Sequence, residues 1–416
     1  MSNIRILTIL FALATVASAQ WPIVTTPGGD GQVFKALAMY DATIIVQNQT
    51  GGLIIMLDCY LTNSDIPCTV EYTFTVPNVP TLGTAATFNG DALLVSDGSG
   101  NIHFIDCDGP FCSYYYSIPI AAGSPPKSII YDDLNTDTFY VAYPSYDGGD
   151  PVVLQISYND TLDTFNITST LNNFREDCIL LDPEDFCFIG PIGRDIAITA
   201  SHDLLFVSFP LANNGRGLIL MYNCTSECVI QNMLYNPYEF PYAGNQVGEG
   251  YGTSISSFTI NDTYINVVVG VPRATLAFDG VDLTNLYTGG AYAFYCDPNN
   301  EAPCSKYQTL TLSSYFSGSC DLINQNYGLY SYAFEDGIFV SSPGLCNGKG
   351  AVFFNSCTVG ACTYSSTITD FTPELADLYG TGLIVNSYFV LAGAKGGPYI
   401  SFSPYSLIYK NSTKIS

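Results

Sequence analysis

The stretch Gly289–Ser313, GGAYAFYCDPNNEAPCSKYQTLTLS, holds the pattern that decides the fold. A glycine stands seven residues before a cysteine, with an apolar run between them, and a polar spacer, a second cysteine and an alternating run follow. The same spacing occurs at Gly52/Cys59, Gly100/Cys107, Gly217/Cys224, Gly289/Cys296 and Gly350/Cys357. Gly149 and Gly397 precede similar runs without the cysteine. The chain therefore carries an internal repeat.

The repeated unit has the composition of four short strands. The seven glycines are 48, 49, 68, 72, 61 and 47 residues apart, and each unit holds runs rich in Val, Ile, Phe, Tyr and Thr, separated by Gly, Pro, Asn and Asp. Such runs are typical of strands and their turns. No helical periodicity extends over ten residues outside the N-terminal segment. The sequence predicts an all-β, seven-bladed β-propeller of four-stranded antiparallel blades.

One domain is expected, because no linker or low-complexity tract divides the chain. We predict a signal peptide over 1–19 and a single domain over 20–416, with blades at 33–78, 81–120, 125–171, 192–234, 250–314, 325–371 and 377–416. The seventh blade could take its outer strand from 407–415 or from 21–27, and we favour the C-terminal segment.

The cysteines are predicted to be disulfide-bonded. Fourteen cysteines, an even number, in an exported chain argue for disulfides rather than free thiols. In each repeat the glycine begins the third strand, the first cysteine ends it, and the second cysteine begins the fourth, so a bond would close the hairpin. The predicted pairs are Cys59–Cys68, Cys107–Cys112, Cys178–Cys187, Cys224–Cys228, Cys296–Cys304, Cys320–Cys346 and Cys357–Cys362. With only two histidines, zinc sites are a poor alternative.

The N-terminus and the sequons predict secretion. Arg5 precedes the apolar run Ile6–Val16, and Ala17-Ser18-Ala19 supplies the small residues that signal peptidase requires. The run is too short to serve comfortably as a membrane anchor. We expect a soluble, secreted glycoprotein. Its six Asn-x-Thr sequons are at Asn48, Asn159, Asn166, Asn223, Asn261 and Asn411.

The charge excludes two classes of partner. The chain has 37 Asp and Glu residues against 12 Lys and Arg residues, a formal net charge of −25. Nucleic acid and anionic lipid would be repelled, so we expect neither nucleic-acid binding nor membrane insertion.

The fifth unit resembles the FG-GAP repeat of integrin α-subunit propellers. Tyr251-Gly252 matches the Phe-Gly of that repeat, and Val269–Pro272 matches its Gly-Ala-Pro. Gly290–Tyr292 matches the strand that follows. Tyr327-Gly328 and Tyr379-Gly380 begin weaker copies. The resemblance implies a seven-bladed propeller with an adhesion role.

Repeats of that family often carry a calcium loop, which this chain largely lacks. The nearest approach is Asp133, Asn135 and Asp137, oxygen donors at alternate positions without the following Gly. A calcium ion takes six to eight oxygens, so a polar turn is the simpler interpretation and we expect no cofactor.

Long connections predict a recognition surface. The segments 172–192, 232–250, 273–288 and 344–349 all join strands at the same face of a propeller, and loops on a rigid scaffold often carry function. We predict binding of an extracellular protein or glycan through their aromatic and polar residues. These are Tyr235, Tyr238, Phe240, Tyr242, Asn245, Glu249, Arg273, Asp279 and Tyr287. The aromatic side chains could instead pack against the propeller and cover its central channel.

Catalysis is the weaker hypothesis. Ser201-His202-Asp203 are adjacent in a turn and cannot converge as a triad, and His103 is expected in the core. The alternative function is a secreted glycan-cleaving hydrolase, which needs two opposed carboxylates. Candidates near the predicted face are Glu176, Asp177, Asp182, Glu184, Asp185 and Glu249. A matrix building block without a discrete site is a third possibility.

Overall fold

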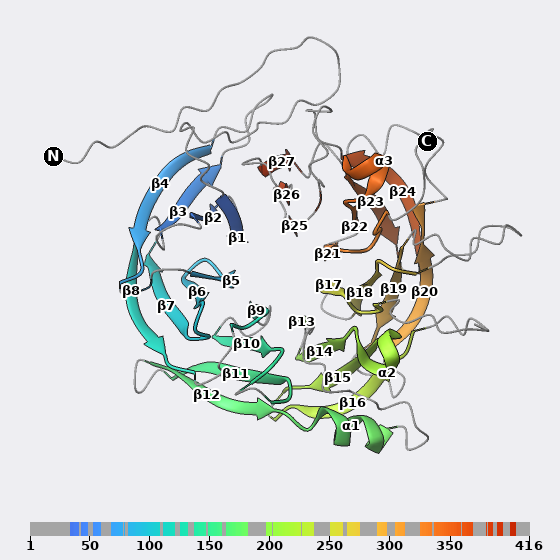
Figure 1. The fold of residues 1–416 in the computed structure, drawn as a ribbon, viewed down its shortest axis with the longest axis horizontal. Helices are drawn as coiled ribbons and strands as arrows, with labels where there is room; N and C mark the ends of the chain where they lie inside the picture. The colour runs from blue at the N-terminus through green and yellow to red at the C-terminus, as the bar shows by residue number, and fades with distance from the viewer. Residues whose placement is uncertain are drawn as a thin grey trace, which may run out of the picture.

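A computed structural model gives the fold. It describes residues 34–40, 43–48, 53–59, 68–77, 79, 82–108, 111–120, 125–131, 137–146, 149–159, 164–181, 197–201, 203–225, 227–236, 250–260, 264–274, 289–297, 304–312, 325–334, 337–358, 360–368, 380, 382–385, 389–393 and 400–404. These residues form six four-stranded antiparallel sheets and one three-stranded sheet, arranged around a circle (Figure 1). The chain is all-β, as predicted.

Each sheet is a meander of consecutive strands. The strands of the first three sheets are β1 Phe34–Tyr40, β2 Thr43–Asn48, β3 Leu53–Cys59, β4 Cys68–Thr75; β5 Leu82–Phe88, β6 Ala92–Asp97, β7 Ile102–Asp108, β8 Phe111–Ile118; β9 Ser128–Tyr131, β10 Thr138–Tyr143, β11 Val152–Asn159, β12 Thr164–Leu171. Those of the next three are β13 Ala197–Ser201, β14 Leu204–Phe209, β15 Leu218–Asn223, β16 Val229–Leu234; β17 Ser254–Ile260, β18 Tyr264–Val271, β19 Gly290–Cys296, β20 Cys304–Leu310; β21 Ser331–Phe334, β22 Gly337–Ser342, β23 Ala351–Thr358, β24 Ala361–Ile368.

The seventh sheet has three strands where four were predicted. It consists of β25 Gly382–Val385, β26 Phe389–Gly393 and β27 Ile400–Pro404. Both segments that could supply a fourth strand, 21–27 and 407–415, lie outside the described residues. The first strand of each sheet contacts the first strand of the next, and β25 contacts both β21 and β1.

The core lies in layers between neighbouring sheets. Second strands are buried on both faces, as in β10, β14 and β22, and the clusters of buried residues each combine side chains of two adjacent sheets. Fourth strands such as β8 and β24 are partly exposed because they form the outer edge. The continuous apolar runs of the sequence are thus the buried strands, and the alternating runs are the outer ones.

A β-bulge recurs in the outer strand of all six four-stranded sheets. In each third-to-fourth strand pair the register skips one residue of the fourth strand. The skipped residues are Glu71, Tyr115, Thr168, Gln231, Tyr307 and Ser365. Bulges strengthen the local twist and re-aim side chains, and the sequence pattern gave no sign of them.

The repeat glycines permit close approach between sheets. A Cβ on Gly289 would lie 2.2 Å from the carbonyl oxygen of Tyr327, and a Cβ on Gly217 would lie 2.0 Å from that of Tyr251. Gly328 has φ +90°, and its Cβ would lie 2.1 Å from the carbonyl oxygen of Gly290. The aromatic–glycine pair of one unit therefore packs against the third-strand glycine of the unit before it.

Four of the predicted disulfides are bonded as expected: Cys107–Cys112, Cys224–Cys228, Cys296–Cys304 and Cys357–Cys362. Cys59 and Cys68 face each other in the β3–β4 register. Cys178 and Cys346 are also disulfide-bonded, and their predicted partners, Cys187 and Cys320, lie outside the described residues.

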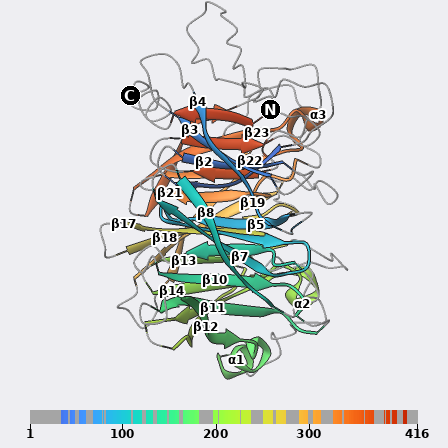
Figure 2. The same cartoon turned by 90° about the vertical axis from the view of Figure 1, so that its left-hand side faces the viewer.

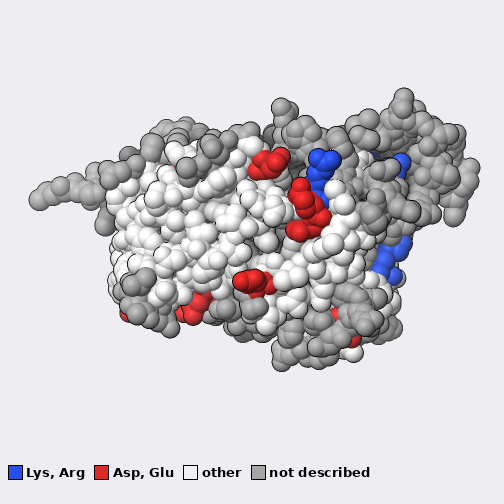
Figure 3. Space-filling model, turned by 90° about the horizontal axis from the view of Figure 1, so that it is seen from below, with Lys and Arg blue, Asp and Glu red and all other residues white. Residues whose placement is uncertain are grey.

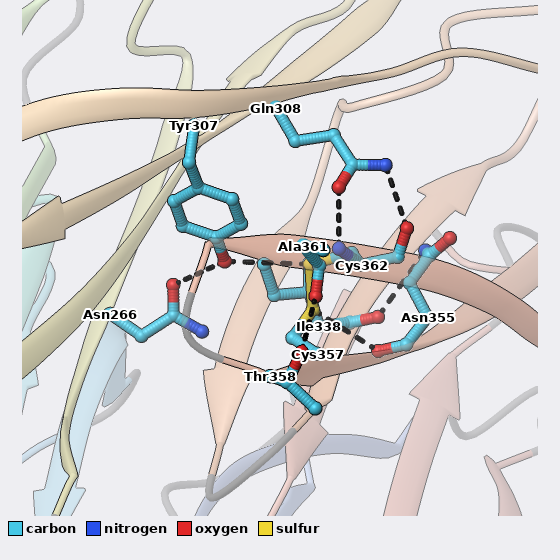
Figure 4. Close-up of a disulfide and its surroundings, with 9 residues drawn as sticks. All are labelled: Asn266, Tyr307, Gln308, Ile338, Asn355, Cys357, Thr358, Ala361 and Cys362. Atoms are coloured by element: carbon cyan, nitrogen blue, oxygen red, sulfur yellow. Dashed lines mark hydrogen bonds between the residues drawn. A yellow bond between two sulfur atoms is a disulfide. The ribbon is translucent and has the colours of Figure 1, made fainter.

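The hairpins closed by disulfides also contact neighbouring sheets (Figure 4). The Gln308 side chain, on β20, donates to the Cys362 carbonyl at 2.7 Å and accepts from the Cys362 amide. The hydroxyl of Tyr307, the bulge residue of the same strand, donates to Asn266 of its own sheet at 2.9 Å and lies 3.4 Å from the Cys362 sulfur of the next sheet. The disulfide sulfur of Cys112 lies 3.1 Å from Met56 Sδ of the preceding sheet. The hairpin end of a blade is thus part of the contact between blades.

Candidate functional site

Two of the nine predicted binding residues are described. Tyr235, after β16, has 44% of its surface exposed, and Arg273, after β18, is exposed. The other seven lie outside the described residues: Tyr238, Phe240, Tyr242, Asn245, Glu249, Asp279 and Tyr287. Asp133 and Asn135, of the weak calcium candidate, do so too. The predicted loop surface therefore stays a prediction.

A groove between the sheets β9–β12 and β13–β16 is a candidate site. Its volume is about 680 Å³. The lining residues are Asp137, Thr138, Tyr140, Gln155, Ser157, Tyr158, Thr168, Ser169, Thr170, Leu171, Asn172, Asn173, Asp177, Asp203, Cys224, Thr225, Glu227 and Cys228. We call this the rim groove.

The strand geometry places hydroxyl groups along one wall of the rim groove. Thr138 and Ser157 are opposite each other in the β10–β11 register, and their hydroxyls lie 3.2 Å apart. The bulge residue Thr168 lies 3.3 Å from the Ser157 hydroxyl and donates to the Gln155 carbonyl at 3.3 Å. This wall offers donors and acceptors in a fixed row.

A helix closes one side of the groove and lies within the segment 172–192, which was expected to be a long connection between strands. α1 spans Phe174–Leu181, and both ribbon views place it at the outer edge of the ring beside β12 (Figures 1 and 2). Phe174 and Cys178 are buried, and Phe174 packs against Phe209 and Tyr222. α1 has only eight residues, so it is compatible with the expectation that no helical periodicity extends over ten residues.

A sequence signal for α1 exists. Asn173 lies before the first turn and Glu176 follows three residues later, the spacing of a capping box, and Glu176 and Asp177 place negative charge in the first turn. The Tyr222 hydroxyl donates to Asp177 Oδ2 at 2.9 Å. Burial, and then the Asp177 carboxylate, raise the pKa of Tyr222, so this hydroxyl stays protonated and anchors the helix to β15.

The rim groove is acidic. It brings together the carboxylates of Asp137, Asp177, Asp203 and Glu227, and no Lys or Arg is among its described lining residues. Figure 3 views the molecule from the side on which β12, α1 and β16 lie, and shows several separate Asp and Glu groups with few Lys or Arg. The groove can accept hydrogen bonds from neutral or cationic donors and disfavours anions.

The candidate metal and catalytic groups have simpler roles. Within the described ranges no group of three or more His, Cys, Asp or Glu residues could hold a metal ion. Ser201 is buried and its hydroxyl contacts that of Thr259 in the next sheet, and His202 lies outside the described residues. Of the candidate carboxylates, Asp177 lines the groove and Glu176 is exposed on α1. The remaining four, Asp182, Glu184, Asp185 and Glu249, lie outside the described residues.

His103 is a core residue, as expected. It is 4% exposed, and its Nε2 lies 3.1 Å from Asp97 Oδ2. Burial alone would raise the pKa of Asp97, but hydrogen bonds from Asn101, from His103 and from two backbone amides hold it below its ordinary value. This pair stabilises the turn between β6 and β7.

Three of the six predicted sequon asparagines have described side chains. Asn159 and Asn166 are exposed and Asn223 is half-buried. Asn223 Oδ1 accepts hydrogen bonds from the Thr225 hydroxyl at 2.6 Å and from the Thr225 amide at 3.1 Å. The side chain of Asn48 and both Asn261 and Asn411 lie outside the described residues.

Comparisons with known proteins support the fold alone. The structure of U3-55K is similar over 93% of this chain and 99% of that one, with a TM-score of 0.55 and 12% identity. The crystal structure of Saccharomyces cerevisiae Sqt1 is similar over 90% of this chain and 96% of that one, with a TM-score of 0.50 and 10% identity. No protein-family model and no curated protein sequence matches the chain.

The six four-stranded sheets and these two likenesses indicate a β-propeller-like fold. No helix among the described residues is long and apolar enough to cross a bilayer.

Proposed function

We propose that the chain is a secreted recognition protein, a closed seven-bladed β-propeller that binds an extracellular glycan or protein. The contact of β25 with β1 supports closure, with the three-stranded sheet as the seventh blade. The disulfides support an oxidising compartment, which agrees with the predicted signal peptide and sequons.

The observation that carries the proposal is the lining of the rim groove. Hydroxyl, amide and carboxylate groups line a volume of about 680 Å³, which is within the ordinary range for a ligand site. Sugar hydroxyls both donate and accept, so a glycan can satisfy this mixture of groups. We propose a glycan segment as the ligand of the groove, with the loops after β16 and β18 as a second contact region.

The kinship with FG-GAP repeats is also a proposal. It is supported by the packing of Tyr251-Gly252 and Tyr327-Gly328, whose backbones approach Gly217 and Gly289 of the preceding units. Tyr251 is fully buried, as an anchor of a repeated motif should be. An adhesion role follows from this kinship only by analogy.

A glycan array probed with the mature, disulfide-bonded protein tests the proposed function. Two groove variants, Asn172→Ala and Glu227→Ala, remove exposed polar groups, and Gln231→Ala removes an exposed amide on β16 outside the groove. Each groove variant should weaken binding of the array hit roughly five- to tenfold, the effect of one lost hydrogen bond. Equal binding by all three variants, or no retained glycan, would contradict the proposal.

The alternative proposal is a secreted hydrolase that cleaves a glycan with a carboxylate pair. It is favoured by the groove itself, where Asp177 of α1 joins Asp203 and Glu227 of the next sheet. Release of reducing ends from the array hit, lost in both Asp203→Asn and Glu227→Gln, would support it. Binding without turnover would leave recognition as the function.

A further inference from the structure

A second, smaller cavity has a different chemistry. It lies between the sheets β5–β8 and β9–β12 and has a volume of about 270 Å³. Its lining residues are Asn89, Asp91, Ala92, Phe104, Asp106, Tyr115, Asp137, Tyr158 and Phe165. We call it the aromatic cavity.

Four aromatic rings form its wall. Phe104 packs against Phe165 with ring centroids 4.4 Å apart and against Tyr115 at 5.8 Å, and Tyr158 packs against Phe165 at 5.0 Å. Phe104 and Phe165 are buried, whereas Tyr115 is 41% exposed. The two sheets thus meet through rings packed in tilted and edge-to-face pairs, and part of the Tyr115 surface faces solvent.

A β-bulge brings Tyr115 to this wall. Phe104 is opposite Tyr116 and Ile105 is opposite Tyr114, so Tyr115 is the extra residue of β8. Without the bulge, strict alternation would send Tyr115 and Tyr116 to opposite faces. Instead both rings contact Phe104, at 5.8 and 5.6 Å. The bulge therefore adds a partly exposed aromatic ring that strand alternation alone would not place here.

Three carboxylates surround the rings. Asp91, Asp106 and Asp137 are exposed and line the cavity, and no Lys or Arg is among its described lining residues. The side chain of Asn89 accepts from the amides of Asp91 at 3.2 Å and Ala92 at 2.8 Å, which fixes the turn that carries Asp91.

The other two carboxylates are held by the strand ladders. Asp106 is opposite Ala92 in the β6–β7 register, and the carbonyl of Asp137 accepts from the Tyr158 amide at 3.0 Å. The three acids come from two sheets and are fixed by backbone contacts.

We propose that the aromatic cavity binds an arginine side chain presented by a partner protein. A guanidinium group stacks on aromatic faces and donates to carboxylates from its edge, so it satisfies both parts of this lining. A metal ion would require oxygen ligands on all sides, and here one whole wall is aromatic. The volume accommodates one side chain rather than a drug-sized ligand, and the net charge of −25 attracts cations from a distance.

This proposal does not depend on the rim groove, because its ligand is a cation and not a sugar. Asp137 and Tyr158 line both sites, so neither residue serves in the test. The probe is a short peptide with one arginine, acetyl-Gly-Arg-Gly-amide, titrated into the full disulfide-bonded protein by calorimetry or NMR. The matched probe replaces arginine with citrulline, which keeps the shape and removes the charge.

The arginine peptide should bind at least tenfold more tightly than the citrulline peptide, and added salt should weaken it. Tyr115→Leu should weaken binding roughly three- to thirtyfold, the range of one cation–π contact, whereas Tyr115→Phe should stay within about twofold of the wild type. Asp106→Asn should weaken binding severalfold. Tyr364→Leu and Asp150→Asn, exposed residues outside the cavity, should bind as the wild type does.

Equal affinity for the two peptides would overturn the proposal. So would an unchanged affinity in Tyr115→Leu, or an equal loss in Tyr115→Leu and Tyr115→Phe, because the aromatic face would then play no part. Near-UV circular dichroism of each variant reports whether the rings still pack.

Discussion

The backbone of Gly328 lies in one of the close contacts between two units, and its replacement by alanine tests whether these contacts require a glycine. Its φ is +90°, and a Cβ there would lie 2.1 Å from the Gly290 carbonyl oxygen. Two hydrogen bonds hold the site in place. The Gly328 amide donates to the Ser341 carbonyl at 2.9 Å, and the Gly328 carbonyl accepts from the Ser254 hydroxyl at 3.1 Å. The neighbouring backbone therefore has little freedom to move away.

The expected loss has two parts. A left-handed backbone costs an L-residue roughly 1–2 kcal/mol. Insertion of a methyl group into a packed region adds about 1–3 kcal/mol, because strand backbone and not a flexible side chain must shift. Gly360 is the matched control, since its φ is +85° and nothing lies within 4 Å of the Cβ position. Gly360→Ala should therefore show only the backbone part.

Urea unfolding of the mature protein, followed by near-UV circular dichroism of its tyrosines, measures both variants. Gly328→Ala should lower the free energy of unfolding by about 2–5 kcal/mol and Gly360→Ala by about 1–2 kcal/mol. The difference between the variants is the energy of the contact between units. Equal losses would refute the close approach of Gly328 to the preceding sheet, and with it the physical reason given for the aromatic–glycine motif.

Three further outcomes are expected. Replacing Cys357 and Cys362 together by serine should cost roughly 2–3 kcal/mol in the same unfolding assay, because the bond closes only a short loop. Tyr222→Phe should cost about 1–2 kcal/mol and speed hydrogen exchange in α1, since it leaves the Asp177 carboxylate without its phenol donor. Asp97→Asn should be less stable than the wild type at neutral pH, and the gap should close as the pH falls below 3.8 through the lowered pKa of Asp97. The sign follows because a depressed carboxyl pKa stabilises the fold only while the group is ionised, and urea midpoints measured down to about pH 2 check it.

Much of the fold could be predicted because the repeated pattern depends on contacts between residues that are close in sequence. The glycine before each third strand and the cysteine at its end follow from turn and hairpin geometry, which involve residues close in sequence. Cys296 and Cys304 face each other in the β19–β20 register, as the spacing predicted. The run Leu204–Phe209 is buried throughout because it is packed on both faces. An uninterrupted run of mostly apolar residues predicts a strand that is buried on both faces.

The candidate sites could be predicted only in part. Asp177 is one of several candidate acids in the sequence, but its place beside Asp203 depends on the packing of α1 against the next sheet. Tyr115 had no distinguishing feature, because a bulge is a property of two paired strands. Phe104 and Tyr115 belong to the β7–β8 hairpin, and Tyr158 and Phe165 belong to the β11–β12 hairpin of the next sheet. No local spacing rule brings the two hairpins together.

The sequence by itself determined the type and order of the described strands, the ends of the hairpins and the pairing of the cysteines in four of them. These features depend on side-chain alternation, glycine conformations and short loops, all of which act within a few residues. Only the tertiary structure decided how one sheet lies against the next, and therefore where α1 docks, which acids share the rim groove and which rings line the aromatic cavity. Contacts between sheets join residues tens of positions apart, and their geometry is set by the packing of whole faces rather than by any local pattern.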